Sequence, residues 1–461
     1  LYFNWNPDNN PGDSLYRVTM TNTSPEMVSA ADEMKMPSTN GEYNSDKSMK
    51  VYSKNGDLFI YDLKTRKEKQ ITNTLDRESS PSFSQNQEKI FYTMSGNLMS
   101  WHMSSGVTTQ RTNFKSGSEK REGKTPENEE WVGKEEMELI QILKERKDKS
   151  DARKKSNDQN EVKRPLTIYT GKASASNFQI SPTEQYITYS LSERPSDGKG
   201  TKVPNYVTES GYIEDLNSRP KVGSPTSDMS VGIYDVVNDT SYAVSTKDLP
   251  NIDVHPDFVK NKDKKREVYV HAPIWSTSGN DAIVVVRSKD NKDRWICSLD
   301  VATGNLKSLD HQHDDAWIGG PGIGWSQWDR TLGWMPDNKS IWFQSEATGY
   351  SHLYTLNVKS GKKKALTKGD FEIYNPRISN NKTAWYFESN EPHPGERYVY
   401  TMPIDGGKVT KLTEGLGRYD AFFSPDDSKI ALLYSDATHP WELFVMENKT
   451  GAEMKKITSS T

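Results

Sequence analysis

The sequence predicts an all-β fold, a β-propeller built from four-stranded blades. Two observations predict this fold: a hairpin pattern that recurs eight times in 461 residues, and a second strand–turn–strand pattern that precedes most copies. A third is the composition, which combines 12 Trp, 22 Tyr and 13 Phe with only 33% hydrophobic residues. Disordered chains are poor in aromatic residues, whereas many short, half-exposed strands with aromatic anchors have this composition.

The recurring hairpin has an apolar run of period two, a polar turn that often contains Gly, and a second strand that ends near Thr or Ser. Such a pattern is typical of two antiparallel strands joined by a tight turn. The eight copies are residues 15–29, 58–72, 98–112, 231–245, 295–309, 353–367, 399–413 and 443–458.

The second pattern is a Ser-Pro or similar turn, then Asp, Asn or Gly, then a β-branched or aromatic strand, as in "FFSPDDSKIALLYS" at 422–435. The two patterns together give four strands, and such a unit buries both of its faces only when neighbouring units stack. The turns keep a pitch of about 40–45 residues, which is typical of propeller blades. We therefore expect eight blades, or seven if one hairpin copy is a coincidence; a pair of β-sandwiches is the alternative. The turn residues are Asp46, Asn86, Asp337, Asn380 and Asp426.

Two segments interrupt the repeats. In residues 116–164 charged residues replace the β pattern, and Thr125 with Pro126 before a run of Glu favours a helix over about 127–146, followed by a solvated loop. Residues 192–228 are rich in Pro, Gly and Ser, so we expect a long ordered loop over a blade face. The repeats and these two insertions together are expected to form a single propeller domain over residues 1–461. Its first blade is expected to be incomplete, because no inner strand pair precedes the first hairpin.

Charge and cysteine content exclude several classes of protein. The net charge of −4 gives no basic field for nucleic acid or an anionic membrane. No apolar run is long enough to span a bilayer, no stretch of the sequence has the pattern of a signal peptide, and "LYFNW" at residues 1–5 reads as the middle of a strand. Cys297 is the single cysteine, so an internal disulfide and a cysteine metal cluster are both excluded.

The sequence contains no persuasive catalytic or metal centre. "GWSQW" is the nearest approach to a G-x-S-x-G elbow, but its fifth residue is Trp, and Ser326 is better interpreted as a loop serine. "HQHDD" at 311–315 lacks a third ligand at a recognisable spacing, so a solvated turn is preferred to a metal site. His271 and His352 lie in strand contexts and are expected to be packed and hydrogen-bonded. No catalytic residue, metal or cofactor is therefore predicted.

Residues 333–367, "GWMPDNKSIWFQSEATGYSHLYTLNVKSGKKKALT", resemble the propeller blades of the prolyl oligopeptidase family of serine peptidases, especially its dipeptidyl-peptidase IV-like branch. "SDATHPWELFVMENKTG" at 435–451 is similar to the last blade of that family. The resemblance covers essentially the whole chain and is most specific in 270–461. It implies that a C-terminal α/β-hydrolase domain carries the catalytic triad, and that this domain is absent from a chain that ends in "KKITSST".

The resemblance also implies a candidate substrate-binding pair. In dipeptidyl peptidases a Glu pair in a W-V-x-x-E-E stretch holds the free amino terminus of the substrate, and this chain has "WVGKEE" with Glu135 and Glu136. Two carboxylates suit one desolvated ammonium group. Gly133 and Lys134 depart from the aromatic and acidic residues of the family, so a solvated helix face is the alternative for this segment.

The sequence thus predicts the non-catalytic propeller of a secreted or periplasmic serine exopeptidase, which restricts access to short or unfolded peptides. Its expected partners are a peptide substrate and the hydrolase domain of the same protein, with a homodimer allowed. The alternative is a TolB-like periplasmic propeller that binds protein partners and has no peptidase activity. A reading frame that continues into a G-x-S-x-G segment would favour the enzyme.

Overall fold

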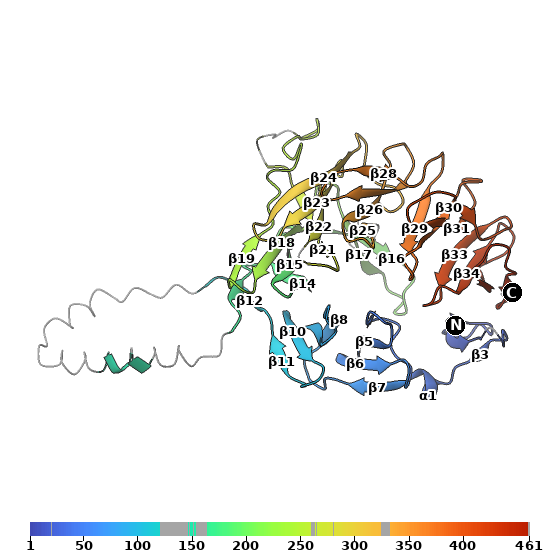
Figure 1. Ribbon diagram of the computed structural model, residues 1–461, viewed down its shortest axis with the longest axis horizontal. Helices are drawn as coiled ribbons and strands as arrows, with labels where there is room; N and C mark the ends of the chain where they lie inside the picture. The colour runs from blue at the N-terminus through green and yellow to red at the C-terminus, as the bar shows by residue number, and fades with distance from the viewer. Residues whose placement is uncertain are drawn as a thin grey trace, which may run out of the picture.

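The chain folds as a series of small antiparallel sheets arranged around a common centre, with both termini on the same side (Figure 1). The computed structural model describes residues 1–19, 21–119, 146, 148–150, 152–153, 164–259, 263, 265–279, 281–323 and 332–459. The predicted all-β propeller fold is confirmed. Among the described residues, no helix is both long and apolar enough to cross a membrane.

Five sheets have four strands each, paired in sequence order. Their strands are β4 (Glu42–Tyr43), β5 (Met49–Lys54), β6 (Asp57–Asp62) and β7 (Lys67–Gln70); β8 (Glu78–Phe83), β9 (Lys89–Met94), β10 (Asn97–His102) and β11 (Thr108–Gln110); β25 (Leu332–Trp334), β26 (Ser340–Ser345), β27 (His352–Asn357) and β28 (Lys363–Ala365); β29 (Ile373–Ile378), β30 (Ala384–Ser389), β31 (Tyr398–Pro403) and β32 (Thr410–Lys411); and β33 (Arg418–Phe423), β34 (Lys429–Ser435), β35 (Glu442–Glu447) and β36 (Lys455–Lys456).

A nine-stranded sheet joins two further units through one parallel contact, between Met229 and Tyr269. Its strands are β14 (Ser174–Ile180), β15 (Tyr186–Glu193), β18 (Asp228–Asp235), β19 (Thr240–Ala243), β20 (Val268–Val270), β21 (Ile274–Trp275), β22 (Ala282–Ser288), β23 (Asp293–Asp300) and β24 (Asn305–His313). The remaining elements are β1 (Tyr2–Trp5), β2 (Ser14–Arg17) and β3 (Glu26–Met27), helix α1 (Ala30–Glu33), the parallel pair β12 (Asn113–Lys115) and β13 (Thr167–Tyr169), and the hairpin of β16 (Gly200–Asn205) and β17 (Glu214–Pro220).

All eight predicted hairpins are present as antiparallel strand pairs. The first of them belongs to a three-stranded sheet, β1–β2–β3, so one strand precedes the hairpin there. The number of blades stays a prediction, because this sheet is short of a strand and two other units share one sheet.

The repeated turn has a physical cause that is visible in several copies. In the turn between β8 and β9, the Oγ of Ser84 accepts a hydrogen bond from the backbone N–H of Lys89, and Gln87 has a φ of +59°. The same arrangement recurs before β34, where Ser424 accepts from the N–H of Lys429 and Asp427 has a φ of +56°. Short polar residues are favoured because they bond to the backbone locally and tolerate the left-handed conformation.

The Thr at the end of five of the repeated hairpins also has a structural role. The Oγ1 of Thr413 accepts a hydrogen bond from the backbone N–H of Val399 at 3.1 Å, and Thr413 is 1% exposed. This bond satisfies a buried donor at the start of the third strand. The same bond is made by four other pairs: Thr72 with Leu58, Thr112 with Leu98, Thr367 with Leu353 and Thr458 with Leu443.

Hydrophobic clusters lie between successive sheets, as stacked blades require. One cluster joins the sheet β4–β7 to the sheet β8–β11, and a larger one joins the three sheets from β25 to β36. The first and last sheets share a cluster that includes Val18 and Val445. In addition, the Nζ of Lys47 donates to the side chain of Asn380 at 2.6 Å and to the carbonyl of Pro425 at 2.9 Å, which links the sheet β4–β7 to the last two sheets.

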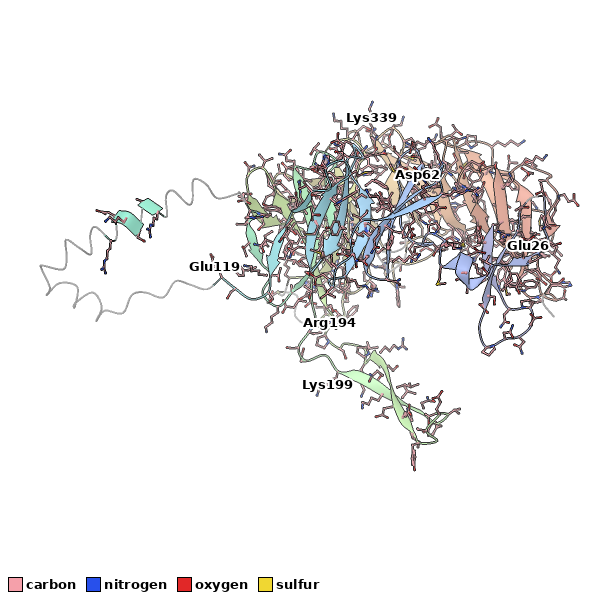
Figure 2. The ribbon with its side chains drawn as sticks, turned by 90° about the horizontal axis from the view of Figure 1, so that it is seen from below. Glu26, Asp62, Glu119, Arg194, Lys199 and Lys339 are labelled. Atoms are coloured by element: carbon pink, nitrogen blue, oxygen red, sulfur yellow. The ribbon has the colours of Figure 1, made fainter. Side chains whose placement is uncertain are left out.

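The two insertions differ from each other. β12 and β13 pair in parallel and hold the two ends of the 116–164 insertion side by side, while the predicted helix lies almost entirely outside the described residues. The 192–228 segment, expected to be a loop over a blade face, instead contains the antiparallel hairpin β16–β17, which projects away from the body (Figure 2). The alternation of residues in "TKVPNY" is compatible with a strand, but the Pro and Gly content of the 192–228 segment indicated a loop instead.

Candidate functional site: the central cavity

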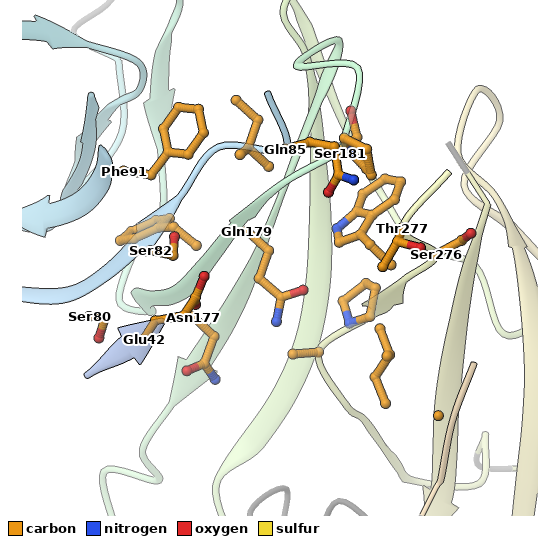
Figure 3. A pocket seen from close by; sticks show the side chains of 18 of the residues that line it. Glu42, Ser80, Ser82, Gln85, Phe91, Asn177, Gln179, Ser181, Ser276 and Thr277 are labelled. Carbon is orange, nitrogen blue, oxygen red and sulfur yellow. The ribbon is translucent and has the colours of Figure 1, made fainter. Parts of the chain in front are cut away.

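A cavity of about 930 Å³ lies at the inner strands of the sheets. Strands β4, β8, β14, β21 and β25 each contribute to its wall, so residues from five units that are far apart in the sequence meet there. Figure 3 shows polar side chains from these strands around the cavity. The neutral polar residues in the wall include Ser80, Ser82, Gln85, Asn177, Gln179, Ser181, Ser276 and Thr277. Hydroxyl and amide groups of this kind suit a ligand with peptide-like donors and acceptors.

Two of the inner strands are distorted where they face the cavity. The register of β8 shifts between Ser79 and Ser82, and that of β14 shifts between Ser176 and Gln179. Ser80 and Asn177, inside these bulges, have φ values of +51° and +50°. A bulge changes the direction in which side chains point and is common beside functional sites. Here it places successive polar side chains of β8 and β14 on the cavity wall.

The acidic group Glu184 in the cavity wall is balanced by two cations. Its carboxylate lies 2.7 Å from the Nζ of Lys89 and 3.2 Å from the Nη2 of Arg111. These contacts connect the sheet β8–β11 to the turn after β14. The wall also includes Arg287 and Arg294, which lie in the paired strands β22 and β23.

His271 lies in the wall of the same cavity and differs from the expectation that it is hydrogen-bonded. Its Nδ1 is buried from solvent and has no hydrogen-bond partner among the described residues. Burial, followed by the charges of Arg287 and Arg294, lowers the pKa of His271 to about 4. The imidazole is therefore neutral at pH 7.

The "HQHDD" motif is not a solvated turn, because His311 and His313 lie on strand β24. Both rings face the buried carboxylate of Asp293, with the Nε2 of His311 at 2.7 Å and the Nδ1 of His313 at 2.9 Å from its Oδ1. Arg266 donates to the other oxygen at 2.5 Å. The alternation of the two histidines is the period-two pattern of a strand, which the polar composition concealed. In the described part of the chain, no group of three His, Cys, Asp or Glu side chains is arranged to hold a metal ion.

His352 is packed and hydrogen-bonded, as expected. It is 1% exposed, its Nε2 donates to the carbonyl of Gly369 at 2.9 Å, and its Nδ1 lies 3.0 Å from the Oγ1 of Thr367. Cys297 is also buried, and burial raises the pKa of its thiol to about 12, so the thiol stays protonated.

The predicted substrate-binding pair, Glu135 and Glu136, lies outside the described residues, and so does Ser326, which was interpreted as a loop serine. The residues that sequence reasoning missed are those of the cavity, above all Arg287 and Arg294. A signal was present, since Arg287 is the last residue but one of the apolar strand "AIVVVRS" and Arg294 is the second residue of the next strand. The register of the hairpin alone places the two arginines opposite each other. Whether they line a cavity depends on the neighbouring sheets, which supply the rest of its wall.

Comparison with known proteins places this architecture in a family. Residues 34–441 match the family described as the dipeptidyl peptidase IV (DPP IV) N-terminal region. A probable dipeptidyl-aminopeptidase B from Arthroderma otae is 24% identical over 272 residues, which cover 55% of this chain and 27% of the relative. Dipeptidyl peptidase 4 from Trichophyton rubrum is 30% identical over 119 residues, which cover 25% of this chain and 15% of the relative.

Solved structures show the same fold. The crystal structure of Porphyromonas gingivalis dipeptidyl peptidase 4 superimposes with a TM-score of 0.57 at 16% identity, covering 99% of this chain and 58% of that chain. A putative dipeptidyl aminopeptidase IV from Bacteroides ovatus gives a TM-score of 0.54 at 13% identity, covering 97% of this chain and 57% of that chain. This chain therefore spans well under two thirds of the length of its relatives. It belongs to the family of dipeptidyl peptidase IV N-terminal regions.

Proposed function

We propose that this chain is the non-catalytic propeller of a dipeptidyl-peptidase IV-like serine exopeptidase, a secreted or periplasmic enzyme, and that it controls which peptides reach the active site. The observation that supports this role is the central cavity of about 930 Å³, whose wall combines neutral polar groups with bulged inner strands. A peptide of one or a few residues fits a volume of this size, whereas a folded protein does not.

The proposed control of access is tested by narrowing the cavity in the full-length protein. Gln179→Trp fills space on the cavity wall, and Lys362→Trp is the control, because Lys362 is exposed beside the outer strand β28. We expect Gln179→Trp to lower kcat/KM for a ten-residue peptide more than for a dipeptide amide, while Lys362→Trp changes neither. An equal effect on both substrates would contradict size control through this cavity.

The second part of the proposal is that Glu135 and Glu136 bind the amino terminus of the substrate. Its support is the "WVGKEE" motif in a chain of this family. The test compares a dipeptide amide with its N-acetylated form in the wild type, Glu135→Gln and Glu136→Gln, with Glu129→Gln as a control from the same segment. Loss of the preference for the free amine in the two variants supports the proposal. Indifference of the wild type to acetylation contradicts it.

A protein-binding role, as in the TolB-like alternative or in a homodimer, is favoured by one observation. The projecting hairpin β16–β17 exposes large apolar side chains around its tip: Tyr206 is 72% exposed, Tyr212 80% and Ile213 64%. Isolated apolar residues are normal on a surface, but several together on a projecting element indicate a contact with protein.

We propose that the hairpin contacts a second copy of this chain. Sedimentation of the full-length protein with Tyr212→Glu should then give a lower mass than the wild type, while Glu209→Gln in the same hairpin leaves the mass unchanged. A monomeric wild type contradicts the homodimer and favours another protein partner.

A further inference from the structure

Arg287 and Arg294 form a pair of buried cations at the cavity wall. They are direct partners across the antiparallel strands β22 and β23, so their side chains leave the same face of the sheet. Arg287 is 3% exposed and Arg294 is 4% exposed, and both line the cavity. Two guanidinium groups side by side and shielded from bulk water create a local positive potential.

Neutral oxygens hold these two side chains in place. Arg287 donates to the carbonyl of Ile318 at 2.5 Å and to the carbonyl of Ile323 at 3.2 Å. Arg294 donates to the carbonyl of Gln344 at 3.1 Å and to the side-chain oxygen of Gln312 at 3.4 Å. For Arg294, these bonds fix the orientation of the guanidinium without neutralising its charge.

Arg294 lacks a close counter-ion. No carboxylate of the described residues lies within ion-pair distance of it, and the nearby Asp310 is bound by the Nζ of Lys363 at 2.7 Å. Burial, then the charge of Arg287, lowers the pKa of Arg294 to about 10, which leaves the group cationic at pH 7. Buried cations are usually paired with an anion, so a site that keeps one unpaired is prepared to accept an anion.

The chain opens a hollow above these arginines. β20 leaves β22 at Val270, opposite Val286, and β21 rejoins it at Ile274, opposite Ile283. Three residues, 271–273, therefore lie opposite two, and all three line the cavity. The bulge also leaves two buried groups in the wall, the Nδ1 of His271 and the Nε1 of Trp275, without a hydrogen-bond partner among the described residues. Both groups can act as hydrogen-bond donors, and both belong to residues that line the cavity.

We propose that this hollow is a binding site for a carboxylate group of a peptide, with Arg294 supplying the charge and His271 and Trp275 supplying further hydrogen bonds. A carboxylate matches the planar fork of a guanidinium. The neutral amides of Asn177 and Gln179, which line the same cavity, suit the peptide backbone that would follow it. The identification of the ligand as a peptide rests on the proposed function. The case for a carboxylate rests only on the charge and the hydrogen-bonding groups of the site and is independent of that function.

The first test is calorimetric titration of the chain with N-acetyl-Ala-Ala, which has a free carboxylate, and with its C-terminal amide. Both probes are acetylated, so binding of an amino terminus at Glu135 and Glu136 contributes to neither. The acid should bind about tenfold more tightly than the amide, as a charge-assisted bond predicts. N-acetyl-Glu-amide distinguishes a side-chain carboxylate from a C-terminal one: binding of either acid supports the site, and binding of neither overturns it.

The second test assigns the affinity to the arginine. Arg294→Gln should remove the preference for the acid, whereas the control Arg377→Gln, whose residue pairs with Asp427 at 2.5 Å outside the cavity, should keep it. Equal affinities in these two variants would overturn the assignment. If Arg294→Gln fails to fold, the wild type supplies a further measurement: a bound anion should raise the pKa of His271, observed by NMR and assigned with His271→Gln. An unchanged His271 pKa at saturation would refute the site. Neither result depends on the cleavage assays of the proposed function.

Discussion

The buried carboxylate of Asp293 is the feature whose removal has the most clearly defined consequence. Asp293 is 2% exposed and accepts hydrogen bonds from Arg266, His311 and His313. Burial raises the pKa of Asp293, but the hydrogen bonds from these three residues outweigh burial and lower the pKa to about 2. Asp293→Asn keeps the size of the side chain and removes its charge.

The magnitude follows from the shift in pKa. A lowering from the ordinary 3.8 to about 2 corresponds to about 2 kcal/mol of stability supplied by the ionised form. Removing one partner of a buried ion pair costs about 3–5 kcal/mol of stability. After Asp293→Asn, however, Arg266 still pairs with Asp290 at 2.8 Å, so we expect this variant to lose about 2–3 kcal/mol. For 461 residues this corresponds to a decrease in Tm of about 2–3 °C.

The effect of Asp293→Asn should also depend on pH. Because the folded pKa of Asp293 is lowered, its contribution is present above 3.8 and is lost as the pH falls through about 2. The hydrogen bond that His313 donates to Asp293 raises the pKa of His313, so that contribution is present below 6.5 and is lost as the pH rises through the folded value. The loss caused by Asp293→Asn should therefore be larger at pH 5.5 than at pH 9.

The assay is thermal unfolding of the wild type, Asp293→Asn and the control Asp315→Asn at both pH values. Asp315 is fully exposed and contacts only one of these groups, the Nε2 of His313 at 3.2 Å, so its variant should lie within about 0.5 kcal/mol of the wild type. Equal Tm values for the two variants, or a larger loss at pH 9, would refute the account of this cluster.

Three further predictions follow from the repeated architecture. Thr413→Val should cost about 1–3 kcal/mol, because the N–H of Val399 loses its acceptor, and Thr413→Ser should restore most of the loss in the same urea titration. Gly232→Ala should cost about 1–3 kcal/mol of stability, because a Cβ at this position would lie 2.2 Å from the ring of Tyr189. The control Gly200→Ala should be tolerated, because the atom nearest to its added Cβ would be 3.5 Å away. Similar urea midpoints for the two variants would contradict this prediction and show that the ring of Tyr189 moves freely. Glu184→Gln should cost about 1 kcal/mol of stability and make unfolding less sensitive to salt, because Lys89 and Arg111 lose the carboxylate that they share. The control is Glu453→Gln, at an exposed position. An equal salt dependence of unfolding in the two variants would contradict this prediction.

The sequence alone determined the repeat and therefore the local structure. Each hairpin is specified within some fifteen residues by apolar alternation, by a turn that tolerates the left-handed conformation at residues such as Gln87 and Asp427, and by a closing Thr such as Thr413. These are local interactions, so all eight hairpins and the propeller class could be predicted from the pattern. The hairpin β16–β17 and the strand position of His311 were missed because polar, exposed strands lack the apolar alternation that marks the others.

Only the tertiary structure decided where the chemistry lies. Ser80, Asn177, His271 and Arg294 are separated by many residues and become neighbours through the stacking of sheets, which no local pattern encodes. The same stacking buries Arg294 and Asp293, and burial is what separates their behaviour from that of the many exposed Arg and Asp residues of the chain. Interactions between charges in water are screened and weak, whereas a charge buried between two sheets is costly unless it is paired. The arrangement of the sheets therefore determines which charged residues are buried and interact strongly with their surroundings.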